Sequence, residues 1–147
     1  MKGVVVTGMG AITPIGNNVV DMWKSMINGK HGIAPITHFD TEGFSTVIAA
    51  EVKGYQPSLY MDKKDIQRYD PFTIFAMGAA SQAVEQSGII EHINHERIGV
   101  YFSTGIGGLF TLENSERVLL KKGPAKVPAF SVPAMISNSA AAMIAIK

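Results

Sequence analysis

The feature that most limits what this chain can fold into is the uncharged stretch at residues 133–146. It contains a run of alanines and no acidic or basic side chain. A helix built from these residues is apolar nearly all round, and such a helix normally lies inside a larger structure or at an interface. We therefore expect one buried helix over 133–146, with no later element in the chain to cover it.

A second helix is predicted over residues 70–88, where the local signals are strongest. Asp70 offers a capping oxygen, Pro71 suits the first helical turn, and Gly88 is a typical stop. The apolar side chains between them recur at the helical period and share one face: Phe72, Phe75, Ala76, Ala79, Ala80, Ala83 and Val84. Weaker signals predict helices over 18–28 and 109–120.

Short runs rich in β-branched residues alternate with these helices. Residues 3–7 and 97–103 fit strands that are buried on both faces, and residues 47–52 fit a third strand. The stretch 30–60, which contains prolines and scattered glycines, fits an irregular surface excursion. This alternation indicates an α/β fold of layered helices and buried strands, in one domain over 1–147.

Composition excludes several classes of protein. With 46% hydrophobic and 17% charged residues, the 147-residue chain is not a disordered tail. A net charge of +1 provides no general attraction for nucleic acid or for an anionic membrane. No apolar stretch reaches the roughly 18 residues that cross a bilayer. We therefore expect a cytoplasmic protein that binds neither nucleic acid nor membrane.

The chain contains no cysteine. This excludes disulfides, thiolate metal sites and a cysteine nucleophile from these residues. His92 and His95 are spaced as metal ligands could be, but no third ligand is near them in the sequence, so a solvated link is favoured. We expect neither a metal nor a cofactor.

Two glycine-rich segments allow a ligand-binding alternative. Gly8 and Gly10 follow a predicted strand, as glycines do in dinucleotide-binding proteins, but Thr13 occupies the third glycine position and the helix begins too late. A small nucleotide-binding α/β protein is thus the less favoured interpretation. The second segment, residues 105–108, could hold an anion on backbone N–H groups, although a close packing turn is favoured.

Five segments together resemble the landmarks of the elongating β-ketoacyl-acyl-carrier-protein synthases of the synthase II type. They occur in the family's order and span the whole chain. They are VVVTGMGAITPIG at 4–16 with Trp23, Gly32-Ile33 with Phe39-Asp40, RYDPF at 68–72, STGIGG at 103–108, and Gly123-Pro124 with Val132-Pro133.

The resemblance implies a thiolase-like fold of two similar α/β halves, assembled as a homodimer. It also implies a decarboxylative Claisen condensation in fatty acid biosynthesis, in which a cysteine carries the acyl group and histidines assist. In the family that cysteine lies a short way beyond the position of Lys147, and the histidines lie in the second half. We therefore expect an incomplete N-terminal half, truncated before the catalytic cysteine, with no catalytic residue and no activity alone.

The resemblance further implies supporting residues for an acyl pocket. Ile106 matches a residue that gates this pocket, and Phe130 with Ser131 matches a dimer-contact segment that reaches toward the partner's acyl tunnel. Some relatives carry an aromatic residue at the position of Ser131, so the resemblance does not fix the preferred acyl chain length.

A basic cluster at Lys63, Lys64 and Arg68 matches the surface with which the family meets its acidic acyl carrier protein. A solvated charged face is the simpler alternative. Two functional alternatives also remain: a non-catalytic half-synthase that docks on a carrier protein or a partner subunit, and a synthase of polyketide assembly.

Overall fold

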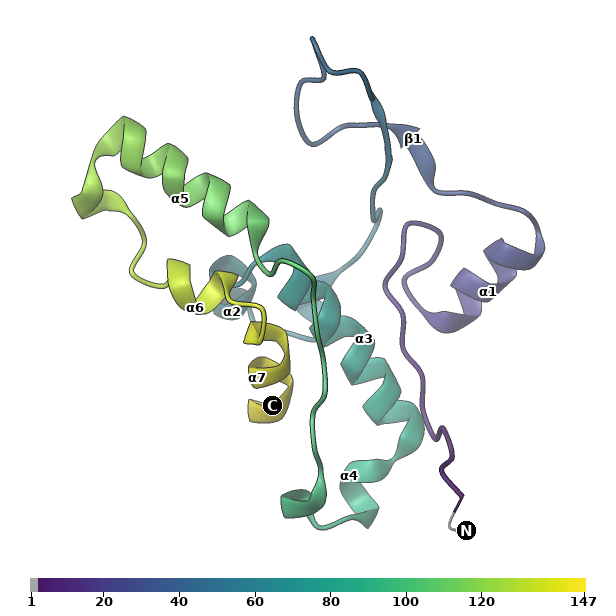
Figure 1. The fold of residues 1–147 in the computed structure, drawn as a ribbon. Helices are drawn as coiled ribbons and strands as arrows, with labels where there is room; N and C mark the ends of the chain where they lie inside the picture. Colours follow the sequence, from purple (N-terminus) through teal and green to yellow (C-terminus); the bar gives the residue numbers. More distant parts are fainter. Residues whose placement is uncertain (1–2) are drawn as a thin grey trace.

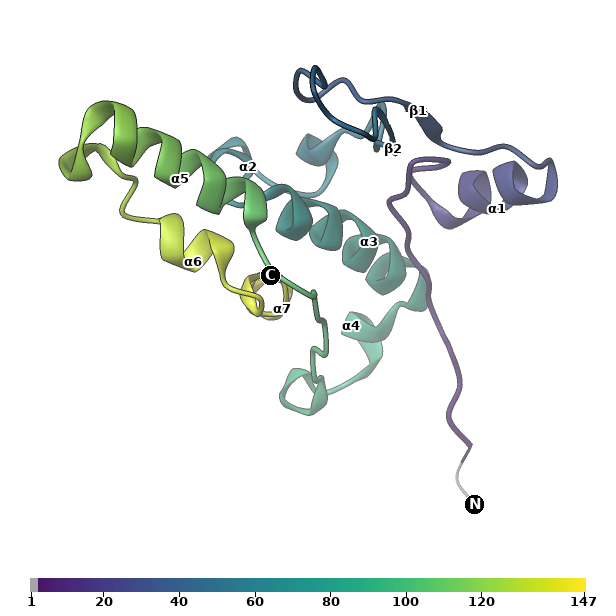
Figure 2. The ribbon, with the colours of Figure 1, turned by 45° about the horizontal axis from the view of Figure 1, so that its top comes forward.

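The computed structural model describes residues 3–147, and the long helix α3 (Pro71–Ser87) lies at its centre. Figure 1 shows α1 on one side of α3 and the hairpin of α5 and α6 on the other, and Figure 2 shows the same arrangement. The other helices are α1 (Val19–Ile27), α2 (Lys63–Arg68), α4 (Ile89–His92), α5 (Leu109–Lys122), α6 (Ser131–Met135) and α7 (Ser139–Ile146). Single 3-10 turns lie at Pro57–Leu59, His95–Arg97 and Pro124–Lys126.

Helix α3 begins and ends as predicted. The Asp70 side chain accepts a hydrogen bond of 3.2 Å from the backbone N–H of Phe72, and Pro71 is the first helical residue. At the other end Gly88 adopts a φ of 61°, a left-handed conformation that glycine reaches without strain. The prediction of α1 is also confirmed, with Asn18 as its cap.

The sequence predicted that α3 is covered along one apolar face. In the structure other segments pack against α3 on more than one side. Met77 packs with Met61 and with Met143 of α7 in the hydrophobic core. On another side Tyr55 packs closely over Gly78, where an added Cβ would overlap the tyrosine hydroxyl. The Tyr55 hydroxyl donates to the backbone carbonyl of Ile74 at 3.0 Å.

The N-terminal glycine turn packs directly on α3. An added Cβ at Gly8 would overlap the carbonyl oxygen of Ala83, and one at Gly10 would overlap that of Ala79. The backbone N–H of Met9 donates to the side-chain oxygen of Gln86 at 2.6 Å. The tight packing turn is thus confirmed, and the close approach that these glycines permit is to a helix of the same chain.

A short antiparallel ribbon joins β1 (Ile33–Pro35) to β2 (Ile48–Ala50), with Ala34 opposite Ala49. This confirms the strand predicted within 47–52. It is the only strand pair among the residues that the structure describes.

Two of the three strand predictions are wrong, because the segments are neither paired nor buried. Residues 3–7 and 98–103 form no strand and pair with no other described segment, and Arg97 belongs to the 3-10 turn that precedes the second of them. Val4 is 99% exposed and Tyr101 is 101% exposed, so neither segment is buried. A strand needs a neighbour that takes up its backbone hydrogen bonds and covers its side chains, and the described residues provide none for these two segments.

The predicted single helix over 133–146 is interrupted. Helix α6 ends at Met135, Ile136 is extended with a ψ of 145°, and α7 begins at Ser139. At the break the backbone N–H of Ser139 donates to the carbonyl oxygen of Ile136 at 3.0 Å, a turn that separates the two helices. The expected burial holds in part, since Ala140 is fully buried while Ile146 is 77% exposed.

Candidate functional site

The basic cluster lies on α2 and faces solvent. Lys63, Lys64 and Arg68 are all exposed. Two acidic side chains share this region, but both are engaged by the C-terminal lysine: Lys147 Nζ lies 3.6 Å from the carboxylate of Asp62 and 3.7 Å from that of Asp65.

None of the three basic side chains of α2 forms an ion pair with another described residue. The neighbouring carboxylates are compensated by a different cation. The cluster therefore presents an uncompensated positive surface, although the whole chain carries a net charge of only +1. Such a surface suits anionic groups, because the attraction acts locally and does not depend on net charge.

Arg68 also contacts the segment that was predicted to support the acyl pocket. Its guanidinium carbon lies 5.0 Å from the centre of the Phe130 ring, a cation–π arrangement. The neighbouring Tyr69 meets the same ring edge to face, with centres 5.3 Å apart and an interplanar angle of 89°. The structure thus brings together two candidate sites that are 62 residues apart in the sequence.

Ser131 follows Phe130 and is fixed by its hydroxyl. That hydroxyl donates to the backbone carbonyl of Pro128 at 2.7 Å and accepts from the hydroxyl of Ser115 at 2.9 Å. Ser115 lies on α5, so this bond ties the start of α6 to α5. Ser131 is half-buried.

The buried carboxylate of Asp70 connects α3 to α5. One oxygen caps α3, and the other accepts hydrogen bonds of 2.8 Å from both the backbone N–H and the hydroxyl of Thr111. Asp70 is only 4% exposed. The sequence predicted the cap but not the bridge, because nothing in the local pattern indicates that Thr111 is near.

The glycine loop before α5 packs against the end of α6. The backbone N–H of Gly108 donates to the carbonyl oxygen of Met135 at 2.8 Å, and an added Cβ at Gly107 would overlap the same oxygen. This confirms the packing turn that the sequence favoured. Ile106, on the same loop, is 74% exposed, and its role as a gate stays a prediction.

The predicted site residues line neither of two cavities in the described chain. One cavity of about 710 Å³ lies between α3, α7 and residues 98–100, and its walls include Met77, Val84, Val100 and Ile144. Its lining is mixed, because Glu85, His95 and Lys147 also contribute to it.

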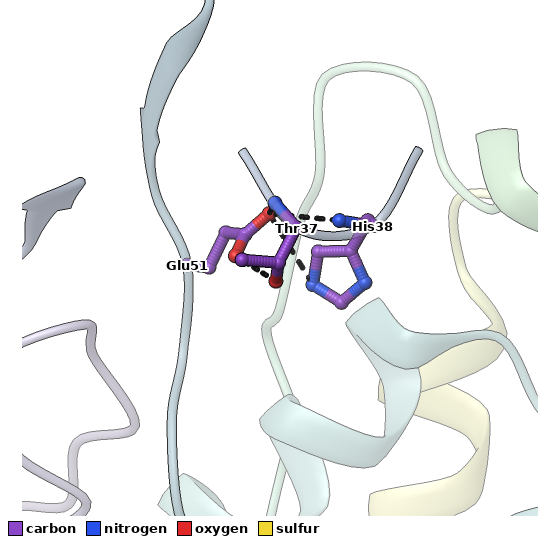
Figure 3. Close-up of polar contacts among 3 residues, drawn as sticks. All are labelled: Thr37, His38 and Glu51. Atoms are coloured by element: carbon purple, nitrogen blue, oxygen red, sulfur yellow. Dashed lines mark hydrogen bonds and ion pairs between the residues drawn. The ribbon is translucent and has the colours of Figure 1, made fainter. Parts of the chain in front are cut away.

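Shifted pKa values also occur away from the candidate surface. Burial, together with the nearby Tyr60, raises the pKa of Tyr55 to about 12. Hydrogen bonds from the backbone and hydroxyl of Thr37 hold the pKa of Glu51 below its ordinary value (Figure 3), as do lesser contributions from His38. These shifts have structural causes and do not indicate a catalytic acid or base.

The described residues offer no evident place for a metal. Within residues 3–147 no three histidine, aspartate or glutamate side chains are arranged to hold one. His95 instead lies with its Nε2 3.1 Å from the carbonyl oxygen of Ile90. None of the helices described is long and apolar enough to cross a membrane.

Comparison with known proteins places the chain in a family. Residues 1–147 match the family model described as "Beta-ketoacyl synthase, N-terminal domain". The chain belongs to the beta-ketoacyl synthase family. Over 147 residues this ketosynthase chain is 46% identical to a protein of Coxiella burnetii named 3-oxoacyl-[acyl-carrier-protein] synthase 2. That match covers 99% of the chain and 36% of the relative.

Solved structures show the same fold. A beta-ketoacyl synthase from Burkholderia phymatum matches with a TM-score of 0.79 at 20% identity, over 99% of this chain and 36% of its own. The AntDE:AntF complex, a type II polyketide acyl-carrier protein with its ketosynthase bound to the hexaketide, matches with a TM-score of 0.78 at 20% identity. That match covers 97% of this chain and 37% of the other. The ketosynthase chain thus has the N-terminal portion of the thiolase-like fold, and it spans about a third of the length of its relatives.

Proposed function

We propose that these residues serve an elongating β-ketoacyl-acyl-carrier-protein synthase of fatty acid biosynthesis. In this reaction malonyl on the carrier protein loses carbon dioxide. The resulting carbanion then attacks an acyl thioester, and the cysteine thiolate that held the acyl group departs. Residues 1–147 contain no cysteine, so their part is to dock the carrier protein through α2 and to support the acyl pocket through Ile106, Phe130 and Ser131.

The observation that carries this proposal is the exposed and uncompensated basic face of α2. Lys63, Lys64 and Arg68 point to solvent while Lys147 engages the two carboxylates beside them. An acidic carrier protein is a partner of matching charge. The AntDE:AntF complex, in which a ketosynthase of similar fold is bound to its acyl-carrier protein, supports the same partner.

The proposal includes a homodimer in the cytoplasm, as the resemblance to these synthases implies. The curated relative at 46% identity is named as a 3-oxoacyl-[acyl-carrier-protein] synthase 2, and the polyketide complex is 20% identical. The greater similarity favours fatty acid elongation over polyketide assembly.

Charge reversal in the full-length protein tests the docking surface. We expect Lys64→Glu to weaken binding of the acyl carrier protein by about tenfold or more, because it replaces an attraction by a repulsion. Lys24→Glu, on the exposed surface of α1, is the matched control and should bind as the parent does. Equal affinities for the two variants in a fluorescence-anisotropy titration would refute docking at α2.

Catalysis by residues 1–147 alone is the second test. Without a cysteine in these residues, neither condensation nor acyl transfer to the protein is expected. Incubation with acyl- and malonyl-carrier protein, followed by mass spectrometry of both proteins, measures this. Robust formation of the 3-oxoacyl product would contradict the proposed division of roles.

A further inference from the structure

We propose that Arg68 couples carrier-protein docking to the orientation of Phe130, and so acts as a positioning residue for the acyl pocket. This inference rests on the proposed function, because it requires that an acidic carrier protein bind at α2. It adds that one side chain belongs to both the docking surface and the pocket-supporting segment.

The first argument is the contact itself. The guanidinium of Arg68 lies over the face of the Phe130 ring at 5.0 Å. The Tyr69 ring packs edge to face with the Phe130 ring. Phe130 is half-buried, whereas Arg68 is exposed. A group that binds the exposed side of Arg68 therefore acts on a cation that already touches the ring.

The second argument is the geometry of arginine. A guanidinium is flat, so it can stack on an aromatic ring with its face while its edge donates N–H groups to a carboxylate or phosphate. Among the described residues no carboxylate lies within ion-pair distance of Arg68. Its edge is therefore available to an acidic partner. A lysine ammonium provides the charge but not the flat face.

The third argument is what Phe130 is attached to. It directly precedes α6, whose first residue, Ser131, is bonded to Ser115 of α5. The other end of α6 is bonded through Met135 to the glycine loop that carries Ile106. A shift of Phe130 thus acts on α6, which contacts both α5 and the glycine loop that carries Ile106.

The expected size of the coupling follows from the contact. An exposed cation–π pair is worth enough to change an equilibrium by about threefold. Coupling between two binding events is reciprocal, so an acyl chain that displaces Phe130 should alter affinity for the carrier protein by the same factor.

A double-mutant cycle in the full-length synthase tests the coupling. Arg68→Gln removes the cation that lies over the ring, while Phe130→Leu keeps an apolar side chain and removes the ring. We expect their effects on kcat/KM for acyl-carrier protein to deviate from multiplicativity by about threefold. Lys63→Gln is the matched control, and its effect should simply multiply with that of Phe130→Leu.

A spectroscopic measurement separates coupling from a general structural role. With 4-fluorophenylalanine placed at position 130, addition of holo-carrier protein should shift the fluorine resonance in the parent and in Lys63→Gln. In Arg68→Gln the shift should be largely lost even at carrier concentrations that saturate binding. This response requires that the ring sense the partner through Arg68.

The outcomes distinguish the two proposals. If the parent binds no carrier protein, the proposed function and the coupling both fail. If the parent binds it but the fluorine resonance does not move and the cycle is multiplicative, docking stands and the coupling is overturned. A resonance shift that persists in saturated Arg68→Gln also overturns the role of Arg68.

Discussion

The carboxylate of Asp70 accepts three hydrogen bonds, one from the first turn of α3 and two from Thr111 of α5. It is almost fully buried, so both of its oxygens need hydrogen-bond partners within the protein. Both Arg68 and Tyr69, which hold Phe130, directly precede this residue. A single side chain thus fixes α5 against the part of the chain that carries the candidate site.

Replacing this carboxylate should be costly. We expect Asp70→Asn to lower the free energy of unfolding by about 3 kcal/mol, because an amide has a single acceptor oxygen and cannot serve both the cap of α3 and the donors of Thr111. Asp62→Asn is the control, because Asp62 makes no side-chain cap hydrogen bond on α2 and only an exposed ion pair with Lys147. It should change stability by about 0.5 kcal/mol or less. Urea unfolding of the parent and both variants measures the difference, and equal losses would contradict this role.

Glu51 has a comparable local role in the β1–β2 ribbon (Figure 3). Its carboxylate accepts hydrogen bonds from the backbone N–H of Thr37 at 2.9 Å, the Thr37 hydroxyl at 2.7 Å and the His38 N–H at 3.3 Å. The Glu51 side chain is 9% exposed, and the His38 ring lies 3.8 Å away. These contacts favour the ionised carboxylate.

The pKa of Glu51 predicts how this contact depends on pH. Because the pKa in the folded protein lies below its ordinary value of 4.5, the stabilisation is complete above that value. It is lost as the pH falls through the folded-state pKa. An NMR titration of the Thr37 amide should have its midpoint below 4.5, and Glu51→Gln should remove the transition. A midpoint at or above 4.5 would contradict the assignment.

At the scale of elements, α3 organises its neighbours through close backbone approach. The glycine turn lies against one side, Tyr55 covers Gly78 on another, and α7 packs near Met77. Small residues at these contacts allow the elements to approach more closely than a side chain would permit.

The glycine turn gives a direct test. We expect Gly10→Ala to destabilise the protein by about 1–3 kcal/mol, since the new Cβ would overlap the carbonyl oxygen of Ala79 and force the turn from α3. Gly3→Ala, whose Cβ would meet nothing within 4 Å, is the matched control. Thermal unfolding and limited proteolysis near residue 10 report the change. Identical behaviour of the two variants would refute the packing argument.

At the scale of the whole molecule, much apolar surface faces solvent. Residues 3–7 and 98–103 expose Val4 and Tyr101 almost completely, and α1 exposes Trp23 at 59%. Further exposed side chains lie on α5 and at the end of α7, as with Phe110 and Ile146. Exposed apolar surface of this extent favours association or aggregation.

Residues 1–147 in isolation should therefore self-associate. We expect strong fluorescence of a hydrophobic dye and sedimentation as species larger than 15.8 kDa, increasing with concentration. A relative of full length, such as the Coxiella burnetii protein, is the comparison. A monomer with no dye binding and a sharp unfolding transition would contradict the expectation.

Features with local causes could be predicted from the sequence. Asp70 and Pro71 mark the start of α3, Gly88 marks its end, and Asn18 caps α1. Each of these residues acts on backbone groups within a few residues. The basic cluster of α2 was evident for the same reason, since its members lie within one short helix. Family membership was also readable, because its landmarks are contiguous motifs.

Features that depend on partners far away in the sequence became visible in the folded molecule alone. Strand propensity at residues 3–7 and 97–103 could not indicate whether a neighbouring strand is present, and pairing requires one. The stacking of Arg68 on Phe130 and the bonds from Thr111 to Asp70 join residues 62 and 41 positions apart. Neither contact leaves a periodic or local signal, because each is set by how α2, α3, α5 and α6 pack together.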